Sequence, residues 1–330
     1  MSPRPLIVLF ATGGTISSLT SQDAAQGYAP ALAGEDLLSR IPGHADIARV
    51  EVTDFSRVVS QDLTLDMVIG LCRQVNRTLS RPDVAGVVIT HGTGTLEDTC
   101  FLADLFVRGD KPVVGTGAMF NASWPEWDGR RNILDALAAA ASPESRGKGV
   151  LVCMNGEVHA ARDVVKMHAS SPAAFVSPGT GPLGCVDDGR VIYYRAPTRR
   201  HTFPSEAIEP EVELIKVAQG SSDRLFRAAL HLGVRGVVIE GLGGRGTIPG
   251  WFFPAIREAL TQGVPVVLCT RSPVGRVAFT VSASMVELGE MGVIPGGDLP
   301  AHKARLLLMA ALAHTRKVEA IRSIFATVAP

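Results

Sequence analysis

The sequence predicts an α/β protein with a larger N-terminal domain built on a mostly parallel sheet and a smaller C-terminal α/β domain. The chain has 330 residues, which is more than a single hydrophobic core usually supports. Short runs of β-branched residues alternate with segments of helical spacing, as they do in βαβ units. Residues 196–210, APTRRHTFPSEAIEP, are rich in proline and charge, which is typical of a linker.

These observations place the N-terminal domain at residues 1–195, a linker at 196–211 and the C-terminal domain at 212–330. The apolar share of 46% and the charged share of 19% are typical of a well-packed globular protein. Lys plus Arg and Asp plus Glu number 32 each, so no net charge attracts nucleic acid or an anionic membrane. The apolar run Leu6–Ala11 is too short for a signal sequence or a membrane span. We therefore expect a cytoplasmic protein.

In the N-terminal domain, short apolar runs predict strands and periodic segments predict helices. The predicted strands are Leu6–Phe10, Val84–Thr90, Pro112–Gly115 and Val150–Met154. The predicted helices are Leu63–Leu79, Thr99–Val107 and Arg131–Ala141. The run VAGVVIT is almost wholly apolar, as expected of a strand that is covered on both faces.

The C-terminal domain continues the same alternation. Its predicted strands are Val212–Val217, Val234–Glu240 and Val264–Cys269, and its predicted helices are Ser222–Leu232, Pro254–Gln262 and Pro300–Ala313. The five cysteines are widely spaced, mostly within apolar runs, and no pair has the C-x-x-C spacing of a zinc or redox site. They are predicted to be buried, reduced thiols.

Three loops at strand ends carry polar side chains, and ligands of open α/β sheets bind at such ends. ATGGTISS follows the first strand and contains Thr12 and Thr15. VSQD, Val59–Asp62, follows a further predicted strand. THGTGTLEDT follows Val84–Ile89 and enters a helix with Glu97 and Asp98 in its first turn.

Several interpretations of these loops compete. Gly and Thr can serve only as turn formers and helix caps. A phosphate-binding loop would require a G-K-[ST] ending, and an α/β-hydrolase a G-x-S-x-G elbow, and the sequence contains neither. GLGGRG, Gly241–Gly246, has the dinucleotide-binding spacing but no helix directly after it, so we interpret it as a glycine-rich turn.

One lysine and three histidines remain as candidates for chemistry. Lys166 lies between Val165 and Met167, which favours partial burial over the solvated position usual for lysine. His91, His159 and His168 lack the spacing of metal ligands and are interpreted as structural or surface residues.

The motifs together resemble the bacterial L-asparaginases over essentially the whole chain. The matching segments, in the order of that family, are A-T-G-G-T-I, S-Q-D, T-H-G-T-x-T-x-E-x-T, K-P-V-V, G-A-M, R-D-V-x-K, G-P-L-G and K-A-R-x-L-L. The resemblance implies a large and a small α/β domain and a homo-oligomer, usually a tetramer, with active sites between subunits. It also implies hydrolysis of a small-molecule side-chain amide with release of ammonia and without any metal or organic cofactor.

Carried over by matching position, the resemblance assigns four catalytic residues. Thr15 is the nucleophile, and Tyr28, on a flexible loop that covers the site, would hydrogen-bond to it. Thr93 would act with Lys166 to activate the nucleophile or the later water. A threonine hydroxyl needs a nearby base, and a lysine is a base only when its surroundings lower its pKa from about 10.

The resemblance also assigns substrate-binding residues. Ser60 and Gln61 would hold the α-carboxylate of the substrate, and Ala118 lines the site through its backbone. Gly94 occupies the position of the aspartate in the family motif H-G-T-D-T. In the family, the carboxylate of that aspartate grips the α-ammonium group of the substrate.

Other family contacts are also replaced. The family's asparagine near the glycine-rich turn is missing from GLGGRG, Met285 aligns with its later glutamate, and Phe120–Asn121 replace an Arg-Pro pair. An unpaired cation in a closed site is costly, so free L-asparagine is expected to bind poorly.

Two functions therefore stay open: an amidohydrolase with an altered substrate, and a non-catalytic binding or sensor protein on the same fold. Retention of Thr15, Tyr28, Thr93 and Lys166 favours the enzyme.

Overall fold

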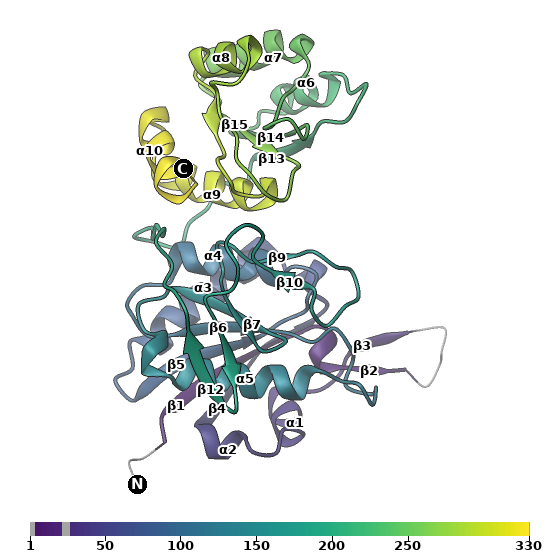
Figure 1. Cartoon of the computed structure of the whole chain (residues 1–330), viewed down its shortest axis with the longest axis vertical. Helices are drawn as coiled ribbons and strands as arrows, with labels where there is room; N and C mark the ends of the chain where they lie inside the picture. The colour runs from purple at the N-terminus through teal and green to yellow at the C-terminus, as the bar shows by residue number, and fades with distance from the viewer. Residues whose placement is uncertain (1–3, 22–26, 330) are drawn as a thin grey trace. The chain divides into compact units, whose positions relative to one another are not determined.

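The computed structural model describes residues 4–21 and 27–329, and the chain divides into two compact units, Met1–Thr198 and Arg199–Pro330 (Figure 1). Residues 194–211, all of them described, contain no helix or strand, and the predicted linker lies within this stretch. No helix in the described part of the chain is long and apolar enough to cross a membrane.

The first unit is built on a sheet whose order is β12-β11-β8-β7-β6-β5-β1-β4 in the described residues. Five of its strands run parallel: β1 (Leu6–Gly13), β4 (Arg49–Val58), β5 (Val84–Thr90), β6 (Val113–Thr116) and β7 (Val150–Met154). Because they are parallel, their carboxyl ends lie at one edge of the sheet, and the loops after them start side by side.

Antiparallel strands that the sequence did not predict extend this sheet. They are β8 (Glu157–Ala160), β11 (Gly184–Asp187) and β12 (Arg190–Tyr193). Two short hairpins lie outside the sheet: β2 (Ser18–Thr20) with β3 (Tyr28–Pro30), and β9 (Val165–Lys166) with β10 (Phe175–Val176). The second hairpin carries Lys166.

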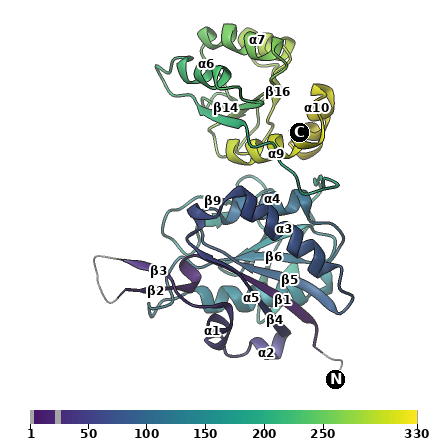
Figure 2. The same cartoon turned by 180° about the vertical axis from the view of Figure 1, so that it is seen from behind.

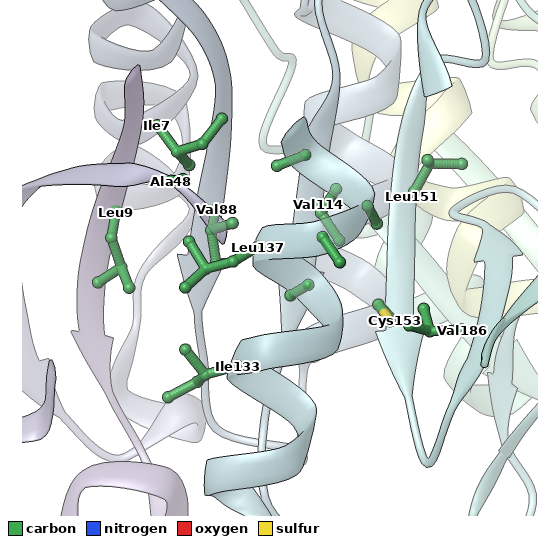
Figure 3. Packing of buried hydrophobic residues seen from close by; sticks show 14 of the residues in the cluster. Ile7, Leu9, Ala48, Val88, Val114, Ile133, Leu137, Leu151, Cys153 and Val186 are labelled. Carbon is green, nitrogen blue, oxygen red and sulfur yellow. The ribbon is translucent and has the colours of Figure 1, made fainter. Parts of the chain in front are cut away.

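Helices cover both faces of the sheet (Figure 2). On one face lie α3 (Leu65–Leu79) and α4 (Leu96–Phe106), and on the other lie α1 (Gly34–Ser39), α2 (His44–Ile47) and α5 (Gly129–Ala141). Ile133 and Leu137 of α5 pack on Leu9 and Val88 of the sheet, and all four are fully buried (Figure 3). Complete burial of such a side chain contributes about 1.5–3 kcal/mol.

The second unit has a smaller parallel sheet in the order β13-β14-β15-β16, formed by Val212–Lys216, Gly236–Gly241, Val266–Thr270 and Ile294–Pro295. Its helices are α6 (Arg224–His231), α7 (Phe253–Thr261), α8 (Ala283–Glu290), α9 (Ala301–His314) and α10 (Val318–Val328). Its core is separate from that of the first unit. The predicted fold class, a larger mostly parallel unit followed by a smaller α/β unit, is confirmed.

All five cysteines lie among the described residues, and none forms a disulfide. Four are buried as predicted, but the prediction is wrong for Cys185, which is half-buried and whose Sγ lies 2.9 Å from the Tyr194 hydroxyl. Cys185 alternates along β11 with the buried Gly184 and Val186, so its side chain points to the less covered face of the strand.

Candidate active site

The loops after β1, β4 and β5 meet at the carboxyl edge of the first sheet. Gly14 lies so close to the next loop that a Cβ added to it would come within 2.2 Å of the Gly92 Cα. A Cβ added to Gly92 would in turn come within 2.7 Å of the Ser60 Cβ. The three polar loops predicted from the sequence are therefore in direct contact, and Thr15, Ser60 and Thr93 lie within or beside the contact.

Gly14→Ala should destabilise the first unit more than an alanine substitution at a glycine that is not in close contact with another loop. Gly14 has φ +82°, and its missing Cβ leaves room for the Gly92 backbone, so alanine adds both left-handed strain and an overlap. We expect a loss of about 3 kcal/mol in the free energy of unfolding, measured by urea denaturation.

Gly109→Ala is the matched control, because Gly109 has φ +90° and nothing within 4 Å of its added Cβ. It should show the strain alone, about 1 kcal/mol. Equal losses in the two variants would mean that the loops do not touch at Gly14.

Thr15 begins the short 3-10 turn η1 (Thr15–Ser17), directly after two glycines in the left-handed region. The turn is fixed by the Ser17 and Ser18 hydroxyls, which both donate to the Gly14 carbonyl, at 3.2 and 2.8 Å. Thr15 itself is half-buried, and within the described residues its hydroxyl has no hydrogen bond. Thr12 differs, because its hydroxyl is buried and donates to the Thr90 carbonyl at 2.9 Å. Of the two threonines, Thr15 therefore has a hydroxyl that is available to a ligand, whereas the Thr12 hydroxyl joins β1 to β5.

Lys166 and Thr93 are brought together from β9 and from the loop after β5. The Lys166 Nζ donates to Thr93 Oγ1 at 2.9 Å. Thr93 is buried and Lys166 half-buried, which confirms the partial burial predicted for the lysine. Burial lowers the pKa of Lys166 below its ordinary value, and the negative charge of Glu97 opposes that shift. The pair has the arrangement of a hydroxyl with an adjacent amine base.

Glu97 is a part of the site that sequence reasoning did not assign. It lies in the first turn of α4 and is 9% exposed, and its Oε1 accepts the Lys166 backbone N–H at 3.3 Å. Glu97 therefore positions β9 and acts electrostatically on the Lys166 side chain. The signal available in the sequence was an acidic residue four positions after Thr93, within an apolar helix.

The residues predicted to bind substrate lie around this pair. Ser60 is buried in the 3-10 turn η3 (Ser60–Asp62), and Gln61 of the same turn is exposed. The Thr95 hydroxyl donates to the Ser60 carbonyl at 3.0 Å, which ties the second loop to the third. Gly94 is exposed, and a Cβ there would come 2.9 Å from the Ser60 Oγ. A side chain at position 94 would thus lie beside Ser60.

Ala118 follows β6 and is fully buried. The loop that carries Ala118 also approaches Thr93, because a Cβ added to the neighbouring Gly117 would lie 3.1 Å from the Thr93 Cγ2. Asp128 fixes the loop by accepting the backbone N–H groups of Met119 and Phe120 at 3.1 and 3.0 Å.

Tyr28 belongs to β3, which lies next to the turn η1 that carries Thr15. It lies in β3 with 51% of its surface exposed, and among the described residues its side chain has no hydrogen bond to Thr15. The flexible loop implied over the site falls partly on residues 22–26, which lie outside the described residues.

The other sequence candidates do not supply a base or a metal site. His91 is fully buried, its Nδ1 lies 2.8 Å from the Gly92 carbonyl oxygen, and burial lowers its pKa to about 4. His91 is therefore neutral near pH 7. His159 is also buried and lies 2.9 Å from the Ser177 hydroxyl, whereas His168 is exposed. No group of three or more potential metal ligands occurs in residues 4–21 and 27–329.

In the second unit, the prediction of a glycine-rich turn at GLGGRG is confirmed. Turns follow β14, and the next α-helix begins only at Phe253. Met285, aligned with the family's glutamate, is fully buried in the core of this unit.

Comparisons with known proteins cover both units. Residues 6–199 match the family model of the asparaginase N-terminal domain, and residues 211–325 match that of the glutaminase/asparaginase C-terminal domain. L-asparaginase 2 of Escherichia coli (strain K12) is 34% identical over 328 residues, covering 97% of this chain and 92% of that protein. Glutaminase-asparaginase of Pseudomonas fluorescens biotype A is 33% identical over 327 residues, covering 97% of this chain and 89% of that protein. The solved structure of the probable cytoplasmic L-asparaginase from Campylobacter jejuni has a TM-score of 0.88 at 30% identity, covering 98% of this chain and 100% of that one.

Proposed function

The chain belongs to the asparaginase family, and from that premise we propose that it is an amidohydrolase that cleaves the side-chain amide of an asparagine-like small molecule and releases ammonia. The observation that carries this proposal is the 2.9 Å contact between the Lys166 Nζ and Thr93 Oγ1, on a loop packed against the one that presents Thr15. This arrangement supplies a nucleophile and a base, which a protein that only binds its ligand does not need.

The proposed reaction has two halves. Thr15 Oγ1 attacks the amide carbonyl, and its proton passes through Thr93 and Lys166 to the leaving nitrogen, so that ammonia departs and an acyl-enzyme ester forms. Water then attacks the ester, its proton returns to Thr15, and the free acid leaves. Backbone N–H groups near the carbonyl would stabilise the oxyanion in both halves. The reaction as written uses no metal and no organic cofactor.

The test is ammonia release from a panel of amides of small dicarboxylic acids, together with mass spectrometry of the quenched protein. The proposal expects ammonia and a transient acyl group on Thr15. Tight binding of an amide without ammonia or an adduct would favour the alternative, a binding or sensor protein.

The substrate is proposed to lack a free α-ammonium group. Gly94 provides no carboxylate beside Ser60, and Met285 is buried in a core. Two acidic residues of the second unit that could replace these carboxylates are already ion-paired: Glu240 with the Lys216 Nζ at 3.1 Å, and Glu287 with Arg257. N-acylated asparagine or a succinamate-like acid therefore suits the site better than free L-asparagine.

Gly94→Asp should shift preference toward free L-asparagine. An added side chain would meet the Ser60 hydroxyl at 2.9 Å, and that hydroxyl can rotate and donate to the new carboxylate. A charge-assisted contact is worth about 1.5–3 kcal/mol, so the ratio of kcat/KM for L-asparagine to that for N-acetylasparagine should rise about 10–100-fold.

Gly94→Asn is the control, because it has the same shape without the charge. An equal rise in the Asn variant would refute the electrostatic explanation, and so would efficient turnover of L-asparagine by the unmodified protein.

Glu97→Gln should move the acidic limb of the kcat/KM profile to lower pH. Glu97 raises the pKa of Lys166, so removing its charge lowers that pKa further, and the neutral amine persists in more acidic solution. Glutamine keeps an oxygen for the Lys166 N–H, and the fold should hold. Glu144→Gln, on the exposed turn η4 (Pro143–Ser145), is the control and should leave the profile in place. A limb that moves upward, or not at all, would mean that Lys166 does not control the limb.

The family resemblance also carries the proposals of a homotetramer and of Tyr28 as a partner of Thr15, and the similar structure from Campylobacter jejuni, named a probable cytoplasmic L-asparaginase, supports the proposal of a cytoplasmic location. All three stay predictions.

A further inference from the structure

Ala118, in the loop after β6, is fully buried, yet neither its backbone N–H nor its carbonyl has a hydrogen bond in the described part of the chain. The next two residues differ, because the N–H groups of Met119 and Phe120 donate to the Asp128 carboxylate at 3.1 and 3.0 Å. A buried peptide group without a partner is costly and therefore rare in folded proteins. The two backbone groups of Ala118 are thus available to a ligand.

Two side chains of α5 hold the peptide groups on either side of Ala118. The Asp128 Oδ2 accepts the Met119 N–H, which belongs to the same peptide group as the Ala118 carbonyl. The Asn132 Nδ2 donates at 2.9 Å to the Gly117 carbonyl, which belongs to the same peptide group as the Ala118 N–H. Each free group of Ala118 therefore has a side chain bonded to the other end of its own peptide group.

Asp128 and Asn132 also form one network. They lie one helical turn apart, and the Asn132 Nδ2 donates to the Asp128 Oδ2 at 3.1 Å. The Asn132 Oδ1 accepts the Asn155 N–H at 3.0 Å, and the Asn132 side chain is buried, so its orientation is fixed. Asp128 has no ion pair within the described residues, whereas Asp135 of the same helix pairs with Arg131 at 2.9 Å. The charge of Asp128 therefore acts on the loop.

Hydrogen bonds at one end of a peptide group polarise the whole group. A carboxylate that accepts the Met119 N–H makes the Ala118 carbonyl oxygen more negative, and hence a stronger acceptor. A donor on the Gly117 carbonyl makes the Ala118 N–H a stronger donor. Bonds to a charged group are about twice as strong as bonds between neutral groups, so the larger effect is expected at the carbonyl.

Ala118 lies beside the proposed proton path. A Cβ added to the adjacent Gly117 would lie 3.1 Å from the Thr93 Cγ2, and the Thr93 hydroxyl accepts a hydrogen bond from the Lys166 Nζ at 2.9 Å. A ligand group that binds to the Ala118 backbone is therefore close to the pair that is proposed to transfer the proton.

We propose that Asp128 and Asn132 are positioning residues, which strengthen the carbonyl and N–H of Ala118 as contacts for the primary amide of the substrate. This inference rests on the proposed function, because it assigns the Ala118 carbonyl to the nitrogen that leaves as ammonia. That nitrogen gains positive charge when it takes up the proton that came from Thr15, and the C–N bond then breaks. A more negative carbonyl stabilises this charged group more than it stabilises the neutral amide.

The first test compares an amide with an ester of the same acid: N-acetylasparagine and the β-methyl ester of N-acetylaspartate. Asp128→Asn keeps the shape of the side chain and removes its charge, so kcat/KM for the amide should fall about tenfold. The value for the ester should change little, because the methoxy group has no N–H for the Ala118 carbonyl. Equal losses for both substrates would mean that Asp128 only supports the fold, and would overturn the proposal.

The second test observes the peptide group itself. The dipeptide Ala-Met occurs once in the sequence, at Ala118–Met119, so ¹³C-carbonyl alanine and ¹⁵N-methionine together give one NMR signal for this peptide group. Its amide proton should move upfield in Asp128→Asn, which loses the charged acceptor. In Thr15→Ala, which is expected to leave the amide intact, N-acetylasparagine should shift the signal more than N-acetylaspartate does.

Asn132→Asp exchanges the donor to the loop carbonyl for a second carboxylate beside Asp128, and it too should lower the amide-to-ester ratio of kcat/KM. Asn76→Asp is the matched control, because the Asn76 Nδ2 donates to the Phe106 carbonyl at 3.0 Å, at the end of α4 far from the site. This variant should lose stability but keep both the ratio and the labelled signal. An unchanged ratio in Asn132→Asp would remove that residue from the proposed role.

The two proposals can fail separately. If the unmodified protein releases no ammonia but its labelled signal still responds to N-acetylasparagine, the hydrolase is refuted and the contact with Ala118 remains. If N-acetylasparagine does not bind to Thr15→Ala in calorimetry, or binds without shifting the signal, the further inference is overturned.

Discussion

Thr15→Ala should lower kcat for ammonia release by about 10⁴-fold while leaving the melting temperature within a degree or two of that of the unmodified protein. The Thr15 hydroxyl has no hydrogen bond within the described residues, so its loss costs the fold little. Its loss removes the atom proposed to form the acyl-enzyme, so no ester should appear on the quenched protein.

Thr12→Ala provides the opposite control in the same loop. The Thr12 hydroxyl donates to the Thr90 carbonyl between β1 and β5, so this variant should lose stability, about 1 kcal/mol, and keep most of its turnover. Substantial activity in Thr15→Ala would sink the assignment and transfer the role of nucleophile to Thr93.

The central strands of the first unit could be predicted because burial on both faces leaves a continuous apolar run. The predicted Val84–Thr90 and Val150–Met154 are the observed β5 and β7. The antiparallel strands β8, β11 and β12 could not be predicted, because each has only four residues and β12 alternates with exposed positions. A four-residue run that is interrupted by polar residues is indistinguishable from a loop.

The candidate site was predictable for a different reason. Parallel strands bring the loops after them to one edge, so two threonine loops at strand ends had to lie near each other. The partial burial of Lys166 was predicted from its apolar neighbours, but its approach to Thr93 was predictable only from the family motif, because it reaches the site from the small hairpin β9–β10, which has no sequence signal of its own.

Glu97 escaped prediction because an acidic residue in the first turn of a helix is ordinarily explained by the helix dipole. The alignment puts Met285 where the family has a glutamate, and the structure shows its side chain in the core of the second unit.

Lys166→Met and Thr93→Val should each lower kcat by about 10³-fold, and the double variant should be no worse than either single one. The Lys166 amine reaches the site through the Thr93 hydroxyl at 2.9 Å, so the two act as one proton-transfer unit, and removing one member leaves the other without a partner. A double-mutant cycle on kcat measures this coupling directly.

Lys148→Met is the matched control and should keep full turnover. Lys148 lies over the Tyr193 ring, 4.6 Å from its centroid, and outside the proposed proton path. Lys166→Met should also lose the acidic limb of the pH profile, because we expect activity of the unmodified protein to rise with pH as the half-buried Lys166 amine loses its proton at its lowered pKa. Additive losses, near 10⁶-fold in the double variant, would show that Thr93 and Lys166 serve separate steps and that the contact between them is structural.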